Sequence, residues 1–267
     1  MNVVILTGGE TRHEFFRKSI ANDSRIKVTS TYCEGTERSL ENRVKGNENS
    51  TRLERQHVRA RAQVEVDFFG SSIKNITDKS NPIFLQKGEI NDDQVVLDII
   101  NQKPDLLVCY GASLIKSKLL EAYHGRFLNV HLGLSPYYRG SGTNVWPLIN
   151  GEPEMVGATF MYIDAGIDTG KIIHQIRADI FLGDSPHSIG NRLIRKMTAN
   201  YTNIIANFEK LEEVEQPNND GKLYMIKDFD GDACGKLYQN LYNGMIEKFL
   251  NTEKSYKYIV ENPGIKS

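Results

Sequence analysis

Three polar side chains stand where they could carry out acid–base chemistry. Asn129 and His131 flank Val130 near the end of an apolar run, and the alternation of a strand puts both on the same face. An amide donor beside a titratable imidazole suits the stabilisation of an oxyanion and the movement of a proton. Asp168 lies between glycines in Gly-Ile-Asp-Thr-Gly, where the backbone can bend sharply, so its carboxylate could orient the imidazole. Taken alone, an Asn-x-His pair on a strand is more often a hydrogen-bonded structural pair than a catalytic one, and an aspartate between glycines is more often a turn residue.

The elements that must position these residues follow an alternating pattern. Apolar runs predict strands at 3–7, 28–32, 105–110, 127–132 and 156–163. A helix is expected after the first strand, and another before residue 105, where Val95, Val96, Ile99 and Ile100 keep helical spacing. Strands and helices in alternation predict an α/β fold with a mostly parallel sheet that is covered on both faces.

One segment, 34–79, interrupts this pattern. Residues 37–55 contain almost no large apolar side chains, so they form either a solvated loop or a helix stabilised by other parts of the fold. Arg52, Arg55 and Arg59 would share one helical face. That face is either solvated or an anion clamp.

Two helices are predicted near the end of the chain. Ser185-Pro186 is a cap followed by proline at the first helical position. The apolar stripe of this helix comprises Ile189, Leu193, Met197, Ile204, Phe208 and Leu211. The polar stretch 216–221 is a candidate linker, and Asp232 a candidate cap for a second helix with Leu237, Leu241, Met245 and Phe249 every four residues. The second stripe could pack on its own domain or on a second copy of the chain, as in a homodimer. We therefore expect an α/β catalytic domain at 1–215 and a helical C-terminal extension at 216–267.

The charge balance, apolar runs and cysteine spacing of the chain argue against several kinds of partner. The chain has 33 basic and 34 acidic residues and a net charge of −1, without the clustered basic excess that nucleic acids or anionic membranes require. The N-terminal apolar run is too short for a signal peptide, and no window approaches the ~20 apolar residues of a membrane span. Cys33, Cys109 and Cys234 are widely spaced, as reduced thiols of a cytosolic protein would be, and no metal-ligand spacing occurs. We expect a cytoplasmic protein that holds no metal.

Two motifs carry a resemblance to a known family. The first is Asn129-Val-His131 followed by Ser-Pro136-Tyr-Tyr-Arg139-Gly140, and the second is Asp164-Ala-Gly-Ile-Asp168-Thr-Gly170-Lys-Ile-Ile. Both resemble the signature of the folate-dependent formyltransferases. That family includes glycinamide ribonucleotide, methionyl-tRNA and sugar-nucleotide N-formyltransferases. The similarity covers roughly Met1 to Glu212 and is close only from Asp105 to Gln175.

The resemblance implies a doubly wound, Rossmann-like α/β fold and assigns roles to the three polar residues. A substrate amine would attack the formyl carbon of 10-formyltetrahydrofolate. Asn129 and His131 would stabilise the oxyanion, and Asp168 would assist proton transfer. By the same resemblance, the folate would bind near Gly111, Ala112, Leu114, Ile163, Asp164, Ala165, Gly166 and Ile167.

Departures from the family's patterns favour one kind of substrate. The phosphate loop of the purine enzymes (Gly-x-Gly-Ser-Asn) is replaced by Gly8-Gly9-Glu10-Thr11-Arg12-His13, and Glu10 would be unfavourable beside a phosphate. The tail after Gly221 does not resemble the basic β-barrel of the tRNA enzymes. The remaining hypothesis is an N-formyltransferase acting on a nucleotide-linked amino sugar. Arg12 and His13, where a parallel sheet exposes its crevice, and Arg139 are the candidate substrate contacts. The alternatives are a glycinamide ribonucleotide or methionyl-tRNA formyltransferase-like enzyme, and a non-catalytic formyltransferase-like binding protein.

Overall fold

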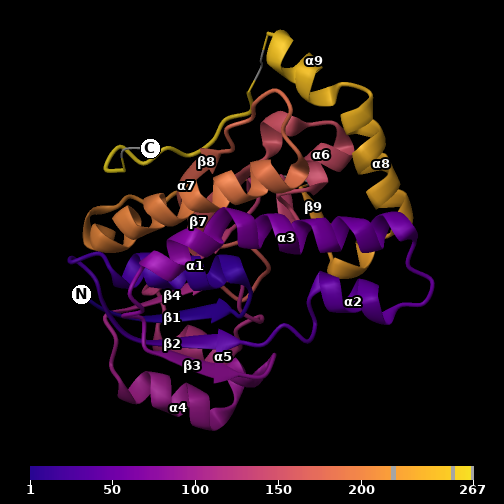
Figure 1. Ribbon diagram of the computed structural model, residues 1–267. Helices are drawn as coiled ribbons and strands as arrows, with labels where there is room; N and C mark the ends of the chain where they lie inside the picture. The colour runs from indigo at the N-terminus through magenta and orange to yellow at the C-terminus, as the bar shows by residue number, and fades with distance from the viewer. Residues whose placement is uncertain (218–220, 254–255, 266–267) are drawn as a thin grey trace.

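The computed structural model describes residues 1–217, 221–253 and 256–265 and is built on a seven-stranded sheet with the order β3-β2-β1-β4-β5-β7-β8 (Figure 1). The strands are β1 (Asn2–Gly8), β2 (Lys27–Glu34), β3 (Pro82–Leu85), β4 (Leu106–Tyr110), β5 (Phe127–His131), β7 (Gly157–Tyr162) and β8 (Ile172–Arg177). The first five are parallel to one another, whereas β7 is antiparallel to both β5 and β8. The mostly parallel α/β sheet is confirmed. Strands β3 and β8 lie outside the predicted strands.

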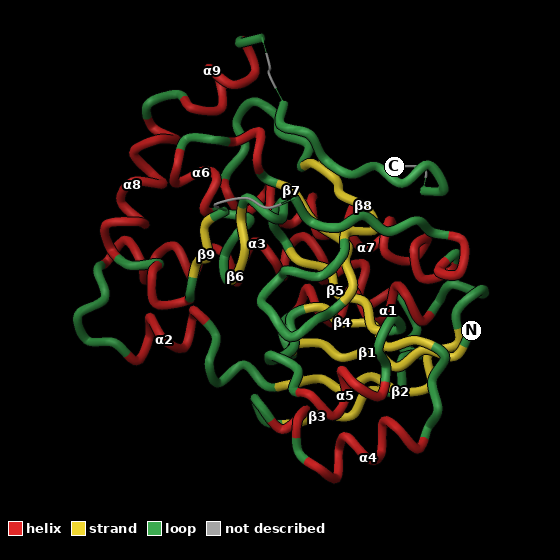
Figure 2. Tube along the Cα trace, turned by 180° about the vertical axis from the view of Figure 1, so that it is seen from behind, coloured by secondary structure: helices red, strands yellow, loops and turns green. Residues whose placement is uncertain are grey.

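Helices cover both faces of this sheet, as a doubly wound fold requires. Alternate β1 residues show the division, because Val3 and Ile5 belong to one apolar cluster, and Val4 and Leu6 to another. The first cluster lies under α1 (Thr11–Ala21), α3 (Arg52–Asn75) and α7 (Pro186–Ala206). The second lies under α4 (Asp93–Asn101) and α5 (Ser117–Ala122), seen from behind in Figure 2. No helix in the described parts of the chain is long and apolar enough to cross a membrane.

The segment that interrupts the sequence pattern is mostly helical. Helix α2 (Leu40–Gly46) is capped by Ser39, and α3 begins at a capping box in which Thr51 and Glu54 satisfy each other's backbone N–H groups. The three arginines predicted to share a face of α3 are all exposed: Arg52, Arg55 and Arg59. They form a solvated surface, while the opposite side of α3 buries Glu54, His57, Val58, Glu65 and Phe69.

The two C-terminal helices differ from the prediction at their ends. Ser185 caps α7 as expected, accepting a hydrogen bond from Ser188 N at 3.1 Å. However, α7 ends at Ala206, so Phe208 lies in the 3-10 turn Phe208–Lys210 and Leu211 follows it. The second helix is in fact two, α8 (Gly231–Tyr242) and α9 (Met245–Asn251), separated at Gly244, which has a left-handed φ of 75°. Its cap is Asp230, which accepts from Ala233 N, rather than Asp232.

The C-terminal part packs on the rest of the chain. Strand β9 (Lys222–Tyr224) pairs with β6 (Tyr138–Gly140), and α8 packs against α3 and α6 (Trp146–Asn150). Leu237 and Met245 from the predicted stripe therefore lie in the same apolar cluster as the sheet. Further along, Gln175 N donates to Val260 O at 2.7 Å. Half of the candidate linker, residues 218–220, lies outside the described residues.

The hairpin between β7 and β8 depends on one glycine. A Cβ on Gly170 would lie 1.9 Å from the carbonyl oxygen of Tyr162, which is closer than any side chain can approach a backbone atom. The two arms of the hairpin must therefore separate if Gly170 is replaced. This hairpin contains Asp168.

We predict that Gly170→Ala lowers the free energy of unfolding by about 1–3 kcal/mol, because the added methyl overpacks the hairpin. The matched control is Gly235→Ala in α8, where a Cβ meets nothing within 4 Å. That change should raise stability by about 0.5–1 kcal/mol, since alanine is the better helix former. Urea unfolding measures both. Equal effects of the two changes would contradict the close approach at Gly170.

Candidate active site

The structure brings Asn129, His131 and Asp168 to the wall of one cavity of about 670 Å³. Asn129 and His131 project from β5, and His131 is 7% exposed. Asp168 comes from the loop between β7 and β8, and its Oδ2 lies 3.2 Å from Nδ1 of His131. Because β7 is antiparallel to β5, this loop starts beside Phe127, so the chain must fold back along β5 for Asp168 to reach His131.

Hydrogen-bond partners fix the tautomer of His131. Nε2 lies 3.0 Å from the carbonyl oxygen of Tyr138, which can only accept. Nε2 also lies 3.1 Å from Oγ1 of Thr143, whose own hydrogen goes to Leu132 O at 2.7 Å. Nε2 therefore carries a hydrogen, and Nδ1 faces the Asp168 carboxylate. That contact is attractive only when a second proton lies between the two groups, as in an imidazolium–carboxylate pair.

Besides His131, Gly140 and Gln216 hold Asp168 in place. Its φ of 54° is left-handed, which is unusual for a residue other than glycine and needs support from its surroundings. Gly140 N donates to the carboxylate at 2.8 Å, and Gln216 Nε2 donates to the Asp168 carbonyl at 2.9 Å and to that of Gly170 at 2.7 Å. Gln216 falls in the predicted linker, since nothing in the local composition indicates that its side chain supports the loop.

Seven of the eight residues predicted to hold a folate line the same cavity: Gly111, Ala112, Leu114, Ile163, Asp164, Gly166 and Ile167. Ala165 does not. Leu114 is 64% and Ile167 36% exposed, so both offer apolar surface to a ligand. Asp164 is occupied within its loop, where it accepts hydrogen bonds from Gly166 N at 3.0 Å and Thr169 Oγ1 at 2.7 Å.

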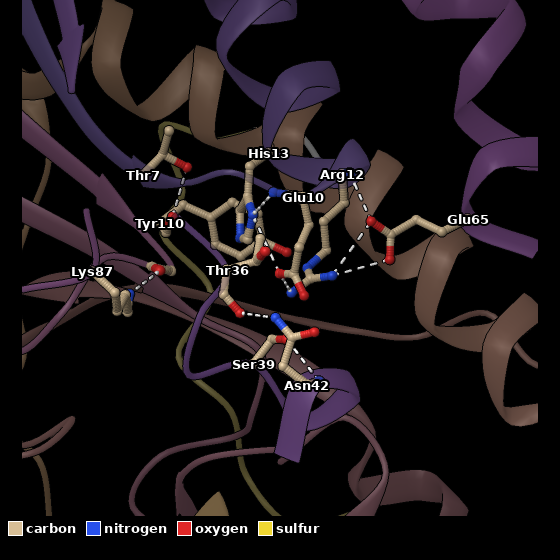
Figure 3. Close-up of polar contacts among 11 residues, drawn as sticks. Thr7, Glu10, Arg12, His13, Thr36, Ser39, Asn42, Glu65, Lys87 and Tyr110 are labelled. Atoms are coloured by element: carbon tan, nitrogen blue, oxygen red, sulfur yellow. Dashed lines mark hydrogen bonds and ion pairs between the residues drawn. The ribbon is translucent and has the colours of Figure 1, made fainter. Parts of the chain in front are cut away.

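Arg12 and His13 also line the cavity, but the Arg12 guanidinium and Nδ1 of His13 are engaged by neighbouring residues (Figure 3). Glu65 accepts from Arg12 N at 2.8 Å and from its guanidinium at 3.0 Å, and Glu10 forms a second ion pair with Arg12. His13 Nδ1 accepts from Glu10 N at 3.2 Å. Burial and the charge of Arg12 hold the pKa of His13 well below its usual value, so the ring is neutral. Neither side chain is a free cation.

The third predicted substrate contact, Arg139, does not line the cavity. It lies on β6, and its guanidinium is 3.4 Å from Gly221 O. This arginine helps to hold β6 beside the chain that leads into β9.

A pair of imidazoles outside the two sequence motifs also lines the cavity. The rings of His57 on α3 and His187 on α7 are 4.7 Å apart, and His57 Nδ1 is 3.0 Å from Tyr238 Oη. Burial lowers the pKa of His57 to about 3 and that of His187 to about 4, with the charge of Arg61 contributing to both. The two histidines are 130 residues apart in the sequence, so no local pattern predicts their contact, which results from the packing of α3 against α7.

Comparison with known proteins agrees with this geometry. The model of the formyl transferase family matches residues 46–205, more than half of the chain. The chain belongs to the formyl transferase family. The match contains Asn129, His131 and Asp168.

Relatives within the family have different substrates. The methionyl-tRNA formyltransferase of Alkaliphilus oremlandii is 39% identical over 115 residues, which are 42% of this chain and 36% of that protein. The chain thus spans only about a third of the length of such curated relatives. A sugar N-formyltransferase from a Shewanella species has a TM-score of 0.57 at 18% identity, over 86% of this chain and 78% of that one. The phosphoribosylglycinamide formyltransferase of Anaplasma phagocytophilum has a TM-score of 0.56 at 15% identity, over 84% and 98%. At these identities the structural matches show the shared fold.

The lowered pKa of His57 makes stability depend on pH. An unfolded chain takes up a proton on this histidine near pH 6.5, whereas the folded protein does so only near pH 3. Between these values the unfolded state binds more protons, so stability falls as the pH falls. At pH 5 the loss for such a group is about 2 kcal/mol.

We predict that His57→Gln, which can keep a hydrogen bond to Tyr238, reduces by about 2 kcal/mol the stability that is lost between pH 7 and pH 5. Urea unfolding of both proteins at the two pH values measures this difference. Parallel pH curves for the wild type and the variant would show that His57 is not buried in its neutral form.

Proposed function

We propose that this protein transfers the formyl group of 10-formyltetrahydrofolate to the amine of a nucleotide-linked amino sugar. The observation that carries the formyl-transfer part is the meeting of Asn129, His131 and Asp168 in one cavity. Membership of the formyl transferase family supports the same chemistry. The identity of the donor as a folate and of the acceptor as an amino-sugar nucleotide goes beyond family membership, and the following arguments support each.

Each of the three residues has a chemical role in this proposal. No hydrogen bond to a described residue engages the side-chain amide of Asn129, so its N–H groups can donate to an oxygen on which negative charge develops. Both ring nitrogens of His131 are engaged, so the ring contributes the positive charge of an imidazolium beside that oxygen. Asp168 shares the proton of that ring and can take up a proton from the attacking amine.

The residues present fit a folate. A cavity of about 670 Å³ is in the usual range for a ligand of this size, and seven predicted folate contacts line it. Bound 10-formyltetrahydrofolate would supply an activated formyl group. Leu114 and Ile167 would cover apolar parts of the donor, and backbone groups at Gly111 and Ile163 would provide its polar contacts.

Two features support an amino-sugar nucleotide as the acceptor. The loop after β1 is closed by the Glu10–Arg12–Glu65 ion pairs, which do not suit the phosphate of a purine precursor. The residues after α7 fold back as β9, α8 and α9 onto the catalytic part. Sugar N-formyltransferases are also among the proteins that share the fold.

The catalytic assignment predicts that His131→Asn and Asp168→Asn each lower kcat at least about 100-fold, because each removes the shared proton while preserving shape. Formyl transfer from 10-formyltetrahydrofolate is followed by mass spectrometry of the acceptor. Thermal unfolding and titration with 5-formyltetrahydrofolate serve as controls and should change little. Near-normal turnover of either variant would overturn the assignment, and a wild type that binds folate without any transfer would favour a binding protein.

The acceptor assignment predicts that at least one nucleotide-linked amino sugar is formylated, and that the free amino sugar loses most of this activity. The nucleotide supplies remote binding energy that helps to drive the reacting step. Glycinamide ribonucleotide and charged initiator tRNA are tested under the same conditions. Faster formylation of either one than of every amino-sugar nucleotide would refute this acceptor and leave formyl transfer intact.

A further inference from the structure

A cationic side chain in the cavity wall has no hydrogen-bond or ion-pair partner among the described residues. Arg61 lies on the inward side of α3, four residues after His57 and four before Glu65, and lines the cavity. It is partly buried, and no described residue forms a hydrogen bond or ion pair with its guanidinium. The exposed arginines of α3 lie on the other side of the helix, so Arg61 is the arginine of this helix that reaches the cavity.

The neighbouring carboxylates are already paired with another arginine. Arg12 holds Glu65 through its backbone N–H and its guanidinium, and it holds Glu10 as well. Burial and the charge of Arg12 lower the pKa of Arg61, and the two carboxylates do not offset this. A guanidinium has five N–H donors in a fork that matches carboxylate and phosphate oxygens, and leaving such donors without acceptors in a buried place is costly.

Two further donors come from the first turns of α7. His187 is 8% and Asn191 6% exposed, and both side chains line the cavity. Nε2 of His187 and Nδ2 of Asn191 have no hydrogen-bond partner within residues 1–217, 221–253 and 256–265. Both lie at the start of a 21-residue helix, whose N-terminus favours negative charge.

We propose that Arg61, His187 and Asn191 form an anion-binding subsite, the α3–α7 subsite, that holds a phosphate of the amine substrate. This inference rests on the proposed function, because it assigns a place to the phosphate of that acceptor. The ligand's oxygens would accept from the Arg61 guanidinium and from the two donors at the start of α7. His57, which stacks against His187, positions that ring.

The chemistry of an anionic oxygen group would also suit the glutamate carboxylate of a folate. The position of the subsite favours the substrate. The expected folate contacts after β4 lie before α5, which covers the opposite face of the sheet from α3 and α7. The α3–α7 subsite belongs to the other wall of the cavity.

Isothermal titration of the full chain with pyrophosphate, uridine diphosphate and 5-formyltetrahydrofolate distinguishes a substrate phosphate from the carboxylate of a folate as the ligand of this subsite. Arg61→Gln should weaken binding of the two phosphate compounds at least about tenfold, because it removes a charge-assisted contact, and should change folate binding less than about twofold. Arg61→Lys should recover part of the loss. Arg59→Gln, on the exposed side of the same helix, is the matched control and should bind like the wild type. His187→Gln tests the α7 side independently if the Arg61 variants fold poorly.

Three other results of these titrations would count against the subsite. Loss of folate binding with phosphate binding intact would assign Arg61 to the folate carboxylate, and wild-type binding by Arg61→Gln and His187→Gln would remove the subsite altogether. A wild type that binds neither phosphate compound at millimolar concentration would also overturn it. Formyl transfer is assayed separately. Phosphate binding that depends on Arg61 without transfer to any amine refutes the proposed function alone, and an unchanged KM for an amino-sugar nucleotide in Arg61→Gln refutes the subsite alone.

Discussion

The arrangement around the active site depends on a proton between His131 and Asp168. Because Nε2 of His131 donates to Tyr138 O, Nδ1 can meet the Asp168 carboxylate favourably only if a second proton is present. Without it, a lone pair and a carboxylate would face each other at 3.2 Å in a largely buried place. The contact between the imidazole and the carboxylate therefore depends on that proton, while Gly140 and Gln216 hold the loop through hydrogen bonds of their own.

The backbone conformation at several positions brings Asp168 and His131 together. The β7–β8 hairpin can close only with glycine at 170, and Asp168 must take a left-handed φ that Gln216 and Gly140 help to hold. A Cβ on Gly133 would lie 2.4 Å from Nε2 of His131, so glycine is needed at that point as well. The carboxylate and the imidazole are thus placed by backbone geometry from β5, the segment after it and the hairpin. Such placement before the ligand arrives reduces the reorganisation needed during reaction.

The sequence predicted those features that local patterns determine. Alternating apolar runs were sufficient to predict most strands of the sheet. The two motifs singled out Asn129, His131 and Asp168, which the fold brings to one cavity. Strand β3 has only four residues, and β8 includes His174 and Gln175, so neither forms a long apolar run. The break at Gly244 and the end of α7 were missed because the apolar spacing continues past the point where the backbone turns. Contacts between distant segments, such as Gln216 with Asp168 or His57 with His187, leave no local signal at all.

The arginines show most clearly why residue type alone does not assign a binding role. Arg12 follows the first strand, where a ligand crevice is expected, yet its charge is neutralised by Glu10 and Glu65. Glu65 comes from α3, 53 residues later, so the pairing depends on the packing of α1 against α3. The same ion pairs that occupy Arg12 leave Arg61 without a carboxylate of its own. Because Glu10 and Glu65 pair with Arg12, Arg61 on α3 is left to bind a ligand. The cationic contact for a substrate therefore lies between α3 and α7 and not in the loop after β1.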